Sequence, residues 1–438
     1  MKIIYLHQHF NTPRSAGGSF SYEWARRFVA NGHEVHVVTA ERSPQRGRWA
    51  RGWDETEEAG IRVHRYPVPY SNEMGYTRRI VSFLRFARAA ARKAATLPGD
   101  VVIATSTPLT IALPGVYAAR KQSIPMVFEI ADLWPELPIA IGALRSPWSI
   151  AAARWLERYA YRHSAHVVAQ SPGVKAGVIA AGYPAEQITE VPCGCDREQF
   201  DVSPEVGREF RARYDWLQDR PLIVYTGTMG PINGVDYLAR VAAVAMRLDP
   251  EVRFLLVGGG REQKKVRREA ERLGVLDKNL FMLPPVPKCE MPAVLSAADL
   301  ATSVFIDLKE MWANNATKVF DAMAAGRPIA VNHQGWLAEM FQHSGCGLVM
   351  DVNDPNSAAG QLVAAVRDRP WLARAGAAAA RLGRERFDRD LLAHRMESIL
   401  LKLVPASRGA CPRARKRRDK PGGSHVSAGT SPAARIVG

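Results

Sequence analysis

Short apolar strands alternate with helical segments along two successive halves of this chain. The first half opens with the strand KIIYL, a loop from His7 to Gly18, an amphipathic stretch from Phe20 to Asn31 and the strand EVHVVTA. The second half begins with PLIVYTGTMG, in which a strand again runs into a glycine-containing loop and then a helix. Strands joined by helices form parallel sheets that are covered on both faces. The sequence therefore predicts an α/β protein of two Rossmann-like, doubly wound domains with a ligand cleft between them.

The chain length supports this division, because 438 residues exceed what one hydrophobic core usually serves. We expect an N-terminal domain over residues 1–200 and a second domain over residues 201–385. A helix over residues 386–404 is expected to pack back on the first domain. The tail over residues 405–438 has eight Arg and Lys residues, one Asp and few large apolar residues, so we expect it to be disordered.

Composition narrows the function classes. Met1 and Lys2 lead directly into a strand, and no run of eighteen apolar residues occurs, so we expect a cytoplasmic protein whose membrane contact is at most peripheral, at the inner face of the cytoplasmic membrane. The five cysteines lack zinc-ligand spacing, and reduced thiols are favoured over a disulfide or metal role. No metal and no cofactor are expected.

The net charge of +16 suggests two classes of partner, anionic membranes and nucleic acids. The stretch over residues 77–95 combines Arg and Lys with Ile, Val, Leu and Phe, so it could lie on an anionic bilayer; a surface helix packed on the sheet explains it equally well. The tail segment RARKRR could bind nucleic acid or anionic lipid, although a solvated extension is the commoner explanation. We expect no nucleic-acid partner.

The segment NNATKVFDAMAAGRP, from Asn314 to Pro328, predicts a polar turn that opens into a short helix. Asn315 is the expected N-cap, residues 316–325 favour a helix, and Gly326 suits the position after its end. The positive end of this helix would face a ligand at the turn. Such an end favours an anion, for example a phosphate.

Three side chains share one face of this predicted helix, namely Thr317, Lys318 and Asp321. Lys318 is unfavourable at the positive end of an isolated helix, but it becomes favourable once a phosphate binds there. The face would then offer a cation for phosphate and a carboxylate for hydroxyl groups. An ordinary surface pair of Lys318 and Asp321 explains the same spacing.

The first domain contributes polar residues at the expected carboxyl ends of its strands, where open parallel sheets bind ligands. Gly17 and Gly18 would let the backbone approach a ligand closely, although the loop does not fit the dinucleotide fingerprint, which disfavours a nicotinamide-dependent oxidoreductase. The segment FEIADLWP adds two carboxylates. The candidates at these strand ends are Ser106, Glu129, Asp132 and Ser171.

Several motifs in the same order carry a family resemblance. They are HQHF with the paired glycines that follow, DLWPE, TGTMGPINGVD, VGGG and NATKVFDAMAAGRPIAVN. From Met1 to about Leu403 the chain resembles the family 4 retaining glycosyltransferases of the GT-B fold. It is most similar to the bacterial sugar transferases that build capsule and O-antigen repeat units, including the fucosamine-transferring type.

The resemblance implies roles for individual residues. The paired glycines would approach the donor phosphates and the acceptor, Asp321 would bind the ribose hydroxyls, and residues near Val286 would border the base. The candidate catalytic residues are Lys318 and, from the strand-end segment of the first domain, Asp132 and Glu129. The implied substrate-binding residues are Gly17, Gly18, Gly227, Thr228, Asn233, Gly258, Val286, Glu310, Asn315, Ala316, Thr317 and Asp321.

The chain departs from the family pattern at four positions. The family's first acidic residue would fall at Ala313, so Glu310 would have to replace it from a shifted loop. Thr228 and Asn233 stand where the family has an Arg and a Lys, which leaves Lys318 as the best cation of the second domain for a diphosphate. Ala131 stands where many relatives have His or Arg.

The resemblance implies transfer of a sugar, with retention of configuration, from a nucleoside diphosphate donor, expected to be UDP-linked, to a hydroxyl group of a lipid-linked glycan or similar acceptor. Lys318 and helix N–H groups would stabilise the departing diphosphate. A nucleotide-sugar epimerase of the same fold is the alternative. Such an enzyme would convert its donor without any acceptor.

Overall fold

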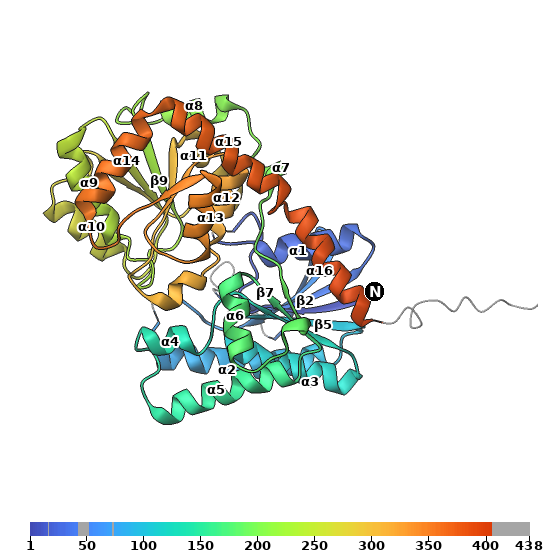
Figure 1. The fold of residues 1–438 in the computed structure, drawn as a ribbon. Coiled ribbons are helices and arrows are strands. Elements are labelled where there is room, and N and C mark those ends of the chain that lie inside the picture. Colours follow the sequence, from blue (N-terminus) through green and yellow to red (C-terminus); the bar gives the residue numbers. More distant parts are fainter. Residues whose placement is uncertain (16, 43–51, 72–73, 405–438) are drawn as a thin grey trace, which may run out of the picture. The chain divides into compact units, whose positions relative to one another are not determined.

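The computed structural model describes residues 1–15, 17–42, 52–71 and 74–404 (Figure 1). The prediction of a disordered tail over residues 405–438 lies outside this part. Two sheets, each with its own helices, make up the described chain. The expected α/β class with two Rossmann-like sheets is confirmed.

The first sheet has eight strands in the order β3-β4-β2-β1-β5-β6-β7-β8, all parallel except β3, which runs antiparallel to β4. Strand β1 alternates its side chains between two cores, as the period of two requires. Ile4 and Leu6 pack in one core, and Ile3 and Tyr5 in the other. The strands are β1 (Lys2–Leu6), β2 (Glu34–Glu41), β3 (Asp54–Glu58), β4 (Ile61–Pro67), β5 (Val101–Ser106), β6 (Met126–Ile130), β7 (His166–Ala169) and β8 (Ile188–Glu190).

Helices cover both faces of this sheet. The core that contains Ile4 is closed by α2, α3, α5 and α6, and the core that contains Ile3 is closed by α1 and α16. Ser171 caps α6 by accepting a hydrogen bond from the Val174 N–H at 3.1 Å. The elements are α1 (Phe20–Ala30), α2 (Tyr76–Ala94), η1 (Leu109–Ile111), α3 (Ala112–Gln122), α4 (Glu136–Ala140), α5 (Pro147–Arg162), α6 (Pro172–Ala180) and η2 (Ala185–Gln187).

The second sheet has six parallel strands in the order β11-β10-β9-β12-β13-β14. They are β9 (Leu222–Thr226), β10 (Arg253–Val257), β11 (Leu280–Leu283), β12 (Leu300–Ser303), β13 (Ile329–Val331) and β14 (Gly347–Val349). Its helical elements are α7 (Arg197–Phe200), α8 (Pro204–Ala212), α9 (Asp236–Leu248), α10 (Gln263–Arg272), η3 (Lys288–Glu290), α11 (Met291–Ala297), η4 (Lys309–Ala313), α12 (Thr317–Ala324), α13 (Trp336–Ser344), α14 (Pro355–Arg367) and α15 (Arg369–Glu385).

The last helix, α16 (Arg389–Leu403), packs on the first sheet although it follows the helices of the second. Leu392, Met396 and Leu400 are buried in the core that contains Ile3. Asp388 caps the helix by accepting hydrogen bonds from two backbone N–H groups of its first turn. Figure 1 shows α16 beside α1.

Helix α12 corrects one detail of the sequence analysis. Its N-cap is Ala316, and the predicted cap Asn315 is turned inward, where its amide donates to Gln170 Oε1 at 3.4 Å. The buried polar partner outcompetes a local cap for this side chain. At the other end Gly326 has φ +61°, as expected for the residue after a helix.

The structure bears on two expectations, the state of the cysteines and the absence of a membrane-spanning segment. Cys193, Cys195, Cys289 and Cys346 are free thiols, and Cys411 lies outside the described residues. Within the described chain no helix is long and apolar enough to span a bilayer.

Candidate active site

A cavity of about 490 Å³ lies at the carboxyl ends of the strands of both sheets. Its walls come from the loops after β1, β5 and β6 in the first sheet and after β9, β10, β11 and β12 in the second. This edge is where open parallel sheets bind ligands. The volume falls within the range of roughly 300–1,000 Å³ that small-molecule sites occupy.

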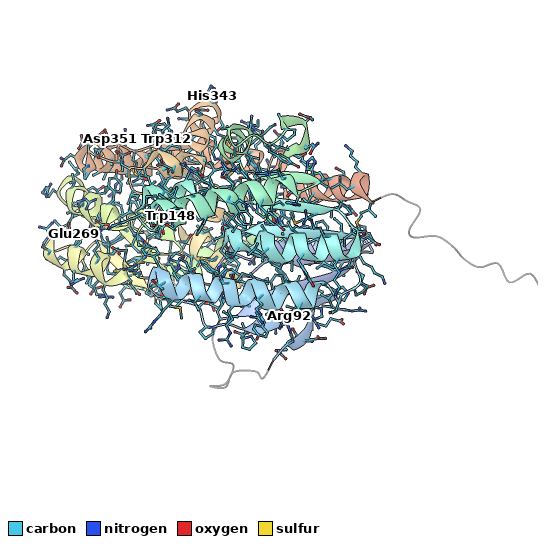
Figure 2. All side chains as sticks on the ribbon, turned by 90° about the horizontal axis from the view of Figure 1, so that it is seen from below. Arg92, Trp148, Glu269, Trp312, His343 and Asp351 are labelled. Atoms are coloured by element: carbon cyan, nitrogen blue, oxygen red, sulfur yellow. The ribbon has the colours of Figure 1, made fainter. Side chains whose placement is uncertain are left out.

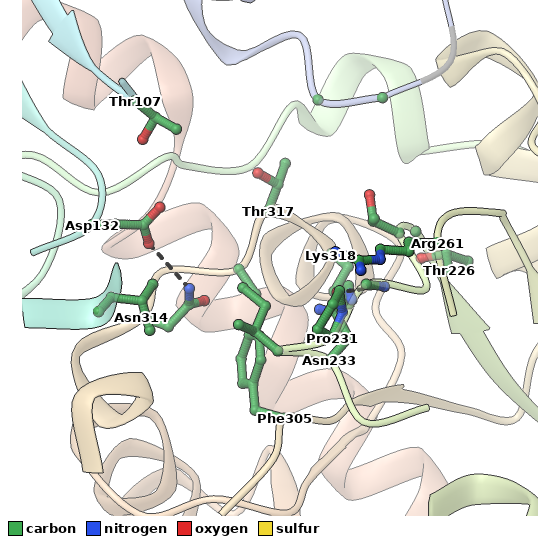
Figure 3. A pocket seen from close by; sticks show the side chains of 18 of the residues that line it. Thr107, Asp132, Thr226, Pro231, Asn233, Arg261, Phe305, Asn314, Thr317 and Lys318 are labelled. Carbon is green, nitrogen blue, oxygen red and sulfur yellow. Dashed lines mark hydrogen bonds between the residues drawn. The ribbon is translucent and has the colours of Figure 1, made fainter. Parts of the chain in front are cut away.

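Lys318 reaches this cavity from the first turn of α12 (Figure 3). Its Nζ donates to the Tyr225 hydroxyl at 2.9 Å and lies 4.1 Å from the centre of the same ring. The Tyr225 hydroxyl in turn donates to the Thr228 carbonyl at 2.7 Å, so its lone pairs face the lysine. Burial lowers the pKa of Lys318 to about 7, against a smaller opposing effect of Asp321. An anion in the cavity would raise this pKa again.

Asp321 lines the same cavity, but it is not simply the free acceptor of hydroxyl groups that the sequence suggested. Its Oδ2 forms an ion pair with Lys288 Nζ, and both side chains are buried. Its Oδ1 has no hydrogen-bond partner in the described chain. Burial raises the pKa of Asp321, and the charge of Lys288 opposes that rise. One carboxylate oxygen is therefore paired with Lys288, while the other is buried without a hydrogen-bond partner in the described chain.

Lys318 is not the only cation of its domain at the cavity in the described chain. Arg261 and Lys288 of the second domain also line the cavity, as does Arg79 of α2 in the first. Arg261 is exposed and makes no ion pair within the described chain. Arg261 directly follows the three glycines after β10, and this position could have marked it as a site residue from the sequence. No local pattern indicated that Lys288 would pair with Asp321.

Asp132 faces the cavity from the loop after β6 and accepts a hydrogen bond from the Asn314 amide at 3.4 Å (Figure 3). Burial raises the pKa of this carboxyl, and the hydrogen bond from Asn314 opposes the rise. Thr107, from the loop after β5, lines the same side of the cavity. Asp132 is thus the carboxylate of the first domain that a ligand can contact.

The other predicted acid of the first domain, Glu129, is not in the cavity. It is fully buried in β6. Its carboxylate accepts hydrogen bonds from four side chains, namely Tyr5, Trp24, Thr105 and Gln170. These donors, all from the first domain, occupy both carboxylate oxygens, and Glu129 does not line the cavity, so its position contradicts a catalytic role.

Most predicted binding residues do meet at the cavity: Gly17, Gly18, Gly227, Thr228, Asn233, Val286, Ala316 and Thr317 line it. Gly258, Glu310 and Asn315 do not. A Cβ on Gly258 would lie 1.9 Å from the Gly227 carbonyl oxygen, so this glycine serves close packing. Glu310 is exposed on η4 and lies outside the cavity lining. Ser106 and Ser171 also lie outside the lining.

Two glycine loops shape the cavity near Lys318. Gly227 has φ +121°, and a Cβ there would lie 3.3 Å from Lys318 Cε. Gly17 has φ +113°, and a Cβ on Gly18 would lie 3.8 Å from Thr317 Oγ1. The glycine loop of the first domain therefore lies against the first turn of α12. In the described residues no group of three or more His, Cys, Asp or Glu side chains is placed to hold a metal ion.

Two family models match the two sheets in turn. A glycosyl transferase 4-like domain matches residues 16–194, and a glycosyl transferases group 1 domain matches residues 207–382. The chain belongs to the family 4 glycosyltransferases. The two matches meet at this cavity, since each contributes residues to its lining.

Curated relatives of this glycosyltransferase include a GDP-mannose-dependent α-(1-6)-phosphatidylinositol monomannoside mannosyltransferase of Mycolicibacterium smegmatis, 26% identical over 53% of this chain and 58% of that protein. A D-inositol 3-phosphate glycosyltransferase of Segniliparus rotundus is 31% identical over 39% of this chain and 41% of that protein. The chain thus spans about half the length of the curated relatives it matches. These relatives are a mannosyltransferase and a D-inositol 3-phosphate glycosyltransferase, which corrects the expected similarity to fucosamine transferases.

The fold of this glycosyltransferase is similar to that of HepE from Anabaena, solved in complex with UDP-glucose. The TM-score is 0.70 at 18% identity, over 92% of this chain and 100% of that chain. This likeness supports the GT-B arrangement of two Rossmann-like sheets.

Proposed function

We propose that this glycosyltransferase moves a hexose or N-acetylhexosamine from a nucleoside diphosphate donor to a hydroxyl group of a lipid-linked glycan or similar acceptor, with retention of configuration, in the assembly of a cell-surface glycan. The observation that carries the proposal is the placement of Lys318. It lies in the first turn of α12, with its ammonium on Tyr225 and the glycine loop of the first domain against the same turn.

The departure of the diphosphate is the step that this arrangement assists. Negative charge grows on the leaving oxygen, and a cation beside helix N–H groups stabilises that charge more than it stabilises the intact donor. Arg261 adds a second cation on the same side. Asp321, whose side chain lines the cavity, would accept hydrogen bonds from the ribose hydroxyls.

Asp132 serves the acceptor in this proposal. Its carboxylate projects from the first domain and is held by Asn314, a residue of the second. A carboxyl with a raised pKa accepts a proton more readily than an ordinary one. Asp132 would therefore orient the attacking hydroxyl group and receive its proton as the sugar is transferred.

We propose UDP or GDP as the nucleotide of the donor. The M. smegmatis relative uses GDP-mannose and HepE was solved with UDP-glucose, so UDP and GDP donors are the two to test. We further propose that the protein works at the inner face of the cytoplasmic membrane, where a lipid-linked acceptor would be presented. Thermal stabilisation by UDP but not GDP, or the reverse, would identify the nucleotide.

The substitution Lys318→Ala tests the proposal. We expect the transfer rate to fall by on the order of one hundredfold, because one stabilising group for the leaving diphosphate is lost. Lys309→Ala, which removes an exposed lysine of η4, is the matched control and should keep the wild-type rate. Near wild-type turnover in Lys318→Ala would contradict the assignment. Conversion of the donor to an isomeric sugar nucleotide without acceptor would instead indicate an epimerase.

A further inference from the structure

The ion pair between Lys288 and Asp321 occupies the carboxylate that the proposed function assigns to the ribose. Asp321 Oδ2 is paired with Lys288 Nζ, and Asp321 Oδ1 is buried with no hydrogen-bond partner in the described chain. A ribose presents two neighbouring hydroxyl groups, and a carboxylate receives such a pair through both of its oxygens. To bind the ribose in this way the carboxylate has to turn out of its present contacts, and Lys288 then loses its partner.

The backbone of Lys288 is held on both sides, whereas its side chain has a single ionic partner. Gln199 Nε2 donates to the Lys288 carbonyl at 3.0 Å, and the Lys288 N–H donates to the Ser15 carbonyl at 3.3 Å. The ammonium lies 5.1 Å from the centre of the Phe200 ring, and its one hydrogen-bond acceptor in the described chain is Asp321. Because a lysine carries its charge on a long flexible stem, this ammonium can change partner while the backbone stays in place.

Asp321 adjoins a lysine on each side. Lys318 stands one turn earlier on α12, and the charge of Asp321 raises its pKa against the larger effect of burial. Lys288 reaches Asp321 from η3. All three side chains line the same cavity. A diphosphate that extends from Lys318 toward Asp321 therefore comes within reach of Lys288.

The cost of opening the buried pair depends on what replaces each partner. Lys288 is 5% exposed and Asp321 is 6% exposed, and a buried charge that loses its partner is strongly unfavourable. A nucleoside offers hydroxyl groups to Asp321 but leaves Lys288 unpaired, and pyrophosphate pairs with Lys288 but leaves Asp321 unpaired. A nucleoside diphosphate supplies a new partner to both.

We propose that Lys288 is a further diphosphate-binding residue, which Asp321 holds in the free protein and releases when ribose hydroxyl groups take its place. This inference rests on the proposed function and adds to it a binding residue and an exchange of partners. The exchange makes the cavity select ligands that carry both a ribose and a diphosphate, over nucleosides and free pyrophosphate.

Titration of the full-length chain with UDP and with uridine, or with GDP and guanosine, tests the exchange. We expect Lys288→Gln to weaken diphosphate binding by about tenfold, since a charge-assisted contact to phosphate is lost. The same variant should bind the nucleoside about threefold tighter or more, because the lysine no longer competes for Asp321. Calorimetry measures the diphosphate, and ligand-observed NMR measures the nucleoside. If Lys288 only supports the fold around Asp321, both affinities fall together, and that result would overturn the proposal.

Lys278→Gln is the matched control. Lys278 is exposed and precedes β11, whereas Lys288 follows this strand. Figure 2 shows Glu269 of the preceding helix α10 at the outer edge of the second domain. The control removes the same charge away from the cavity and should bind both ligands as the wild type does. An equal loss of diphosphate affinity in the two variants would mean that net charge alone is responsible, and the proposal would be wrong.

Inorganic pyrophosphate tests the release of Lys288 separately. The titration is run at about pH 6, where Lys318 is charged because its pKa is about 7. Asp321→Asn frees Lys288 without any ribose, so we expect pyrophosphate to bind about tenfold tighter than to the wild type. In the Lys288→Gln background the same substitution only removes a negative charge and should give a clearly smaller gain. An equal gain in both backgrounds would show that Lys288 does not reach the phosphate.

These results can be separated from those on the proposed function. If neither UDP nor GDP stabilises the wild-type protein and no donor is consumed, the proposed function fails and the exchange fails with it. If donors are consumed but Lys288→Gln weakens nucleoside and diphosphate binding alike, only the exchange at Asp321 fails.

Discussion

At the scale of single residues, the state of the site depends on the proton of Lys318. The ammonium of Lys318 contacts the hydroxyl group and the aromatic ring of Tyr225, and burial lowers its pKa to about 7. The charge of Asp321 raises the pKa of Lys318 slightly, but Asp321 also forms an ion pair with Lys288. Burial lowers the pKa of His333 below 6.5, and the charge of Lys318 lowers it further. This imidazole is therefore neutral above pH 7. Lys318 is therefore expected to titrate around pH 7 in the free protein and to be mostly neutral toward pH 9.

Nucleotide affinity should then depend on pH with a definite sign. Bound diphosphate raises the pKa of Lys318, so binding takes up a proton when the free lysine is neutral. As the pH rises from about 7 to 9, the dissociation constant of UDP or GDP should increase by up to about tenfold per pH unit. Calorimetric titration across this range measures the effect.

Lys318→Arg is the matched variant for this experiment, because an arginine stays charged throughout the range. Its nucleotide affinity should change little between pH 7 and 9. A wild-type affinity that also stays flat would show that Lys318 is charged before the nucleotide arrives. Any titration of the nucleotide itself is common to both proteins and cancels in the comparison.

At the scale of elements, the sequence predicts the individual strands and helices. It does not predict the contacts between residues that are distant in sequence and that the order of the strands brings together. The strands KIIYL and LIVYTG and the helix after Thr317 could be predicted because periodicity and flanking glycines are local signals. The ion pair of Lys288 with Asp321 joins residues from different elements of the second domain. Glu129 had the composition of a site residue, but four hydrogen-bond donors from distant parts of the first domain enclose it. Such pairings follow only from the three-dimensional arrangement.

The loop after β9 gives the prediction at this scale. Gly227→Ala places a methyl group about 3.3 Å from Lys318 Cε at a residue with φ +121°, so both backbone and lysine must shift. We expect a loss of unfolding free energy of about 1–3 kcal/mol together with weaker nucleotide binding. Gly32→Ala has φ +83° and no neighbour within 4 Å of the added methyl group, so it controls for backbone strain alone.

Denaturant unfolding and nucleotide titration on the two glycine variants separate the effects. Both variants should lose stability, and only Gly227→Ala should lose nucleotide affinity. If Gly32→Ala weakens nucleotide binding as much, the effect of Gly227→Ala comes from general destabilisation and not from the displaced lysine.

At the scale of the whole described chain, a buried ionic cluster connects α16 to the rest of the protein. Arg389, at the start of α16, is 1% exposed; its Nε lies 2.8 Å from Asp196 Oδ1 and its Nη2 donates to the Gly194 carbonyl at 2.8 Å. Asp196 also pairs with Arg27 of α1 at 3.3 Å. The cluster therefore joins α1, α16 and the segment that leads from the first sheet to the second.

Removing one member of this cluster should be costly, because it leaves Asp196 with a single partner in a buried site. We expect Arg389→Met to lower the free energy of unfolding by about 3–5 kcal/mol, as measured by denaturant titration. Arg395→Met, an exposed position on the same helix, should change it by less than about 0.5 kcal/mol. Adding Asp196→Asn to Arg389→Met should recover part of the loss, since the unpaired charge is then gone. Equal stability of Arg389→Met and Arg395→Met would mean that apolar packing alone, through Leu392, Met396 and Leu400, holds α16 on the first sheet.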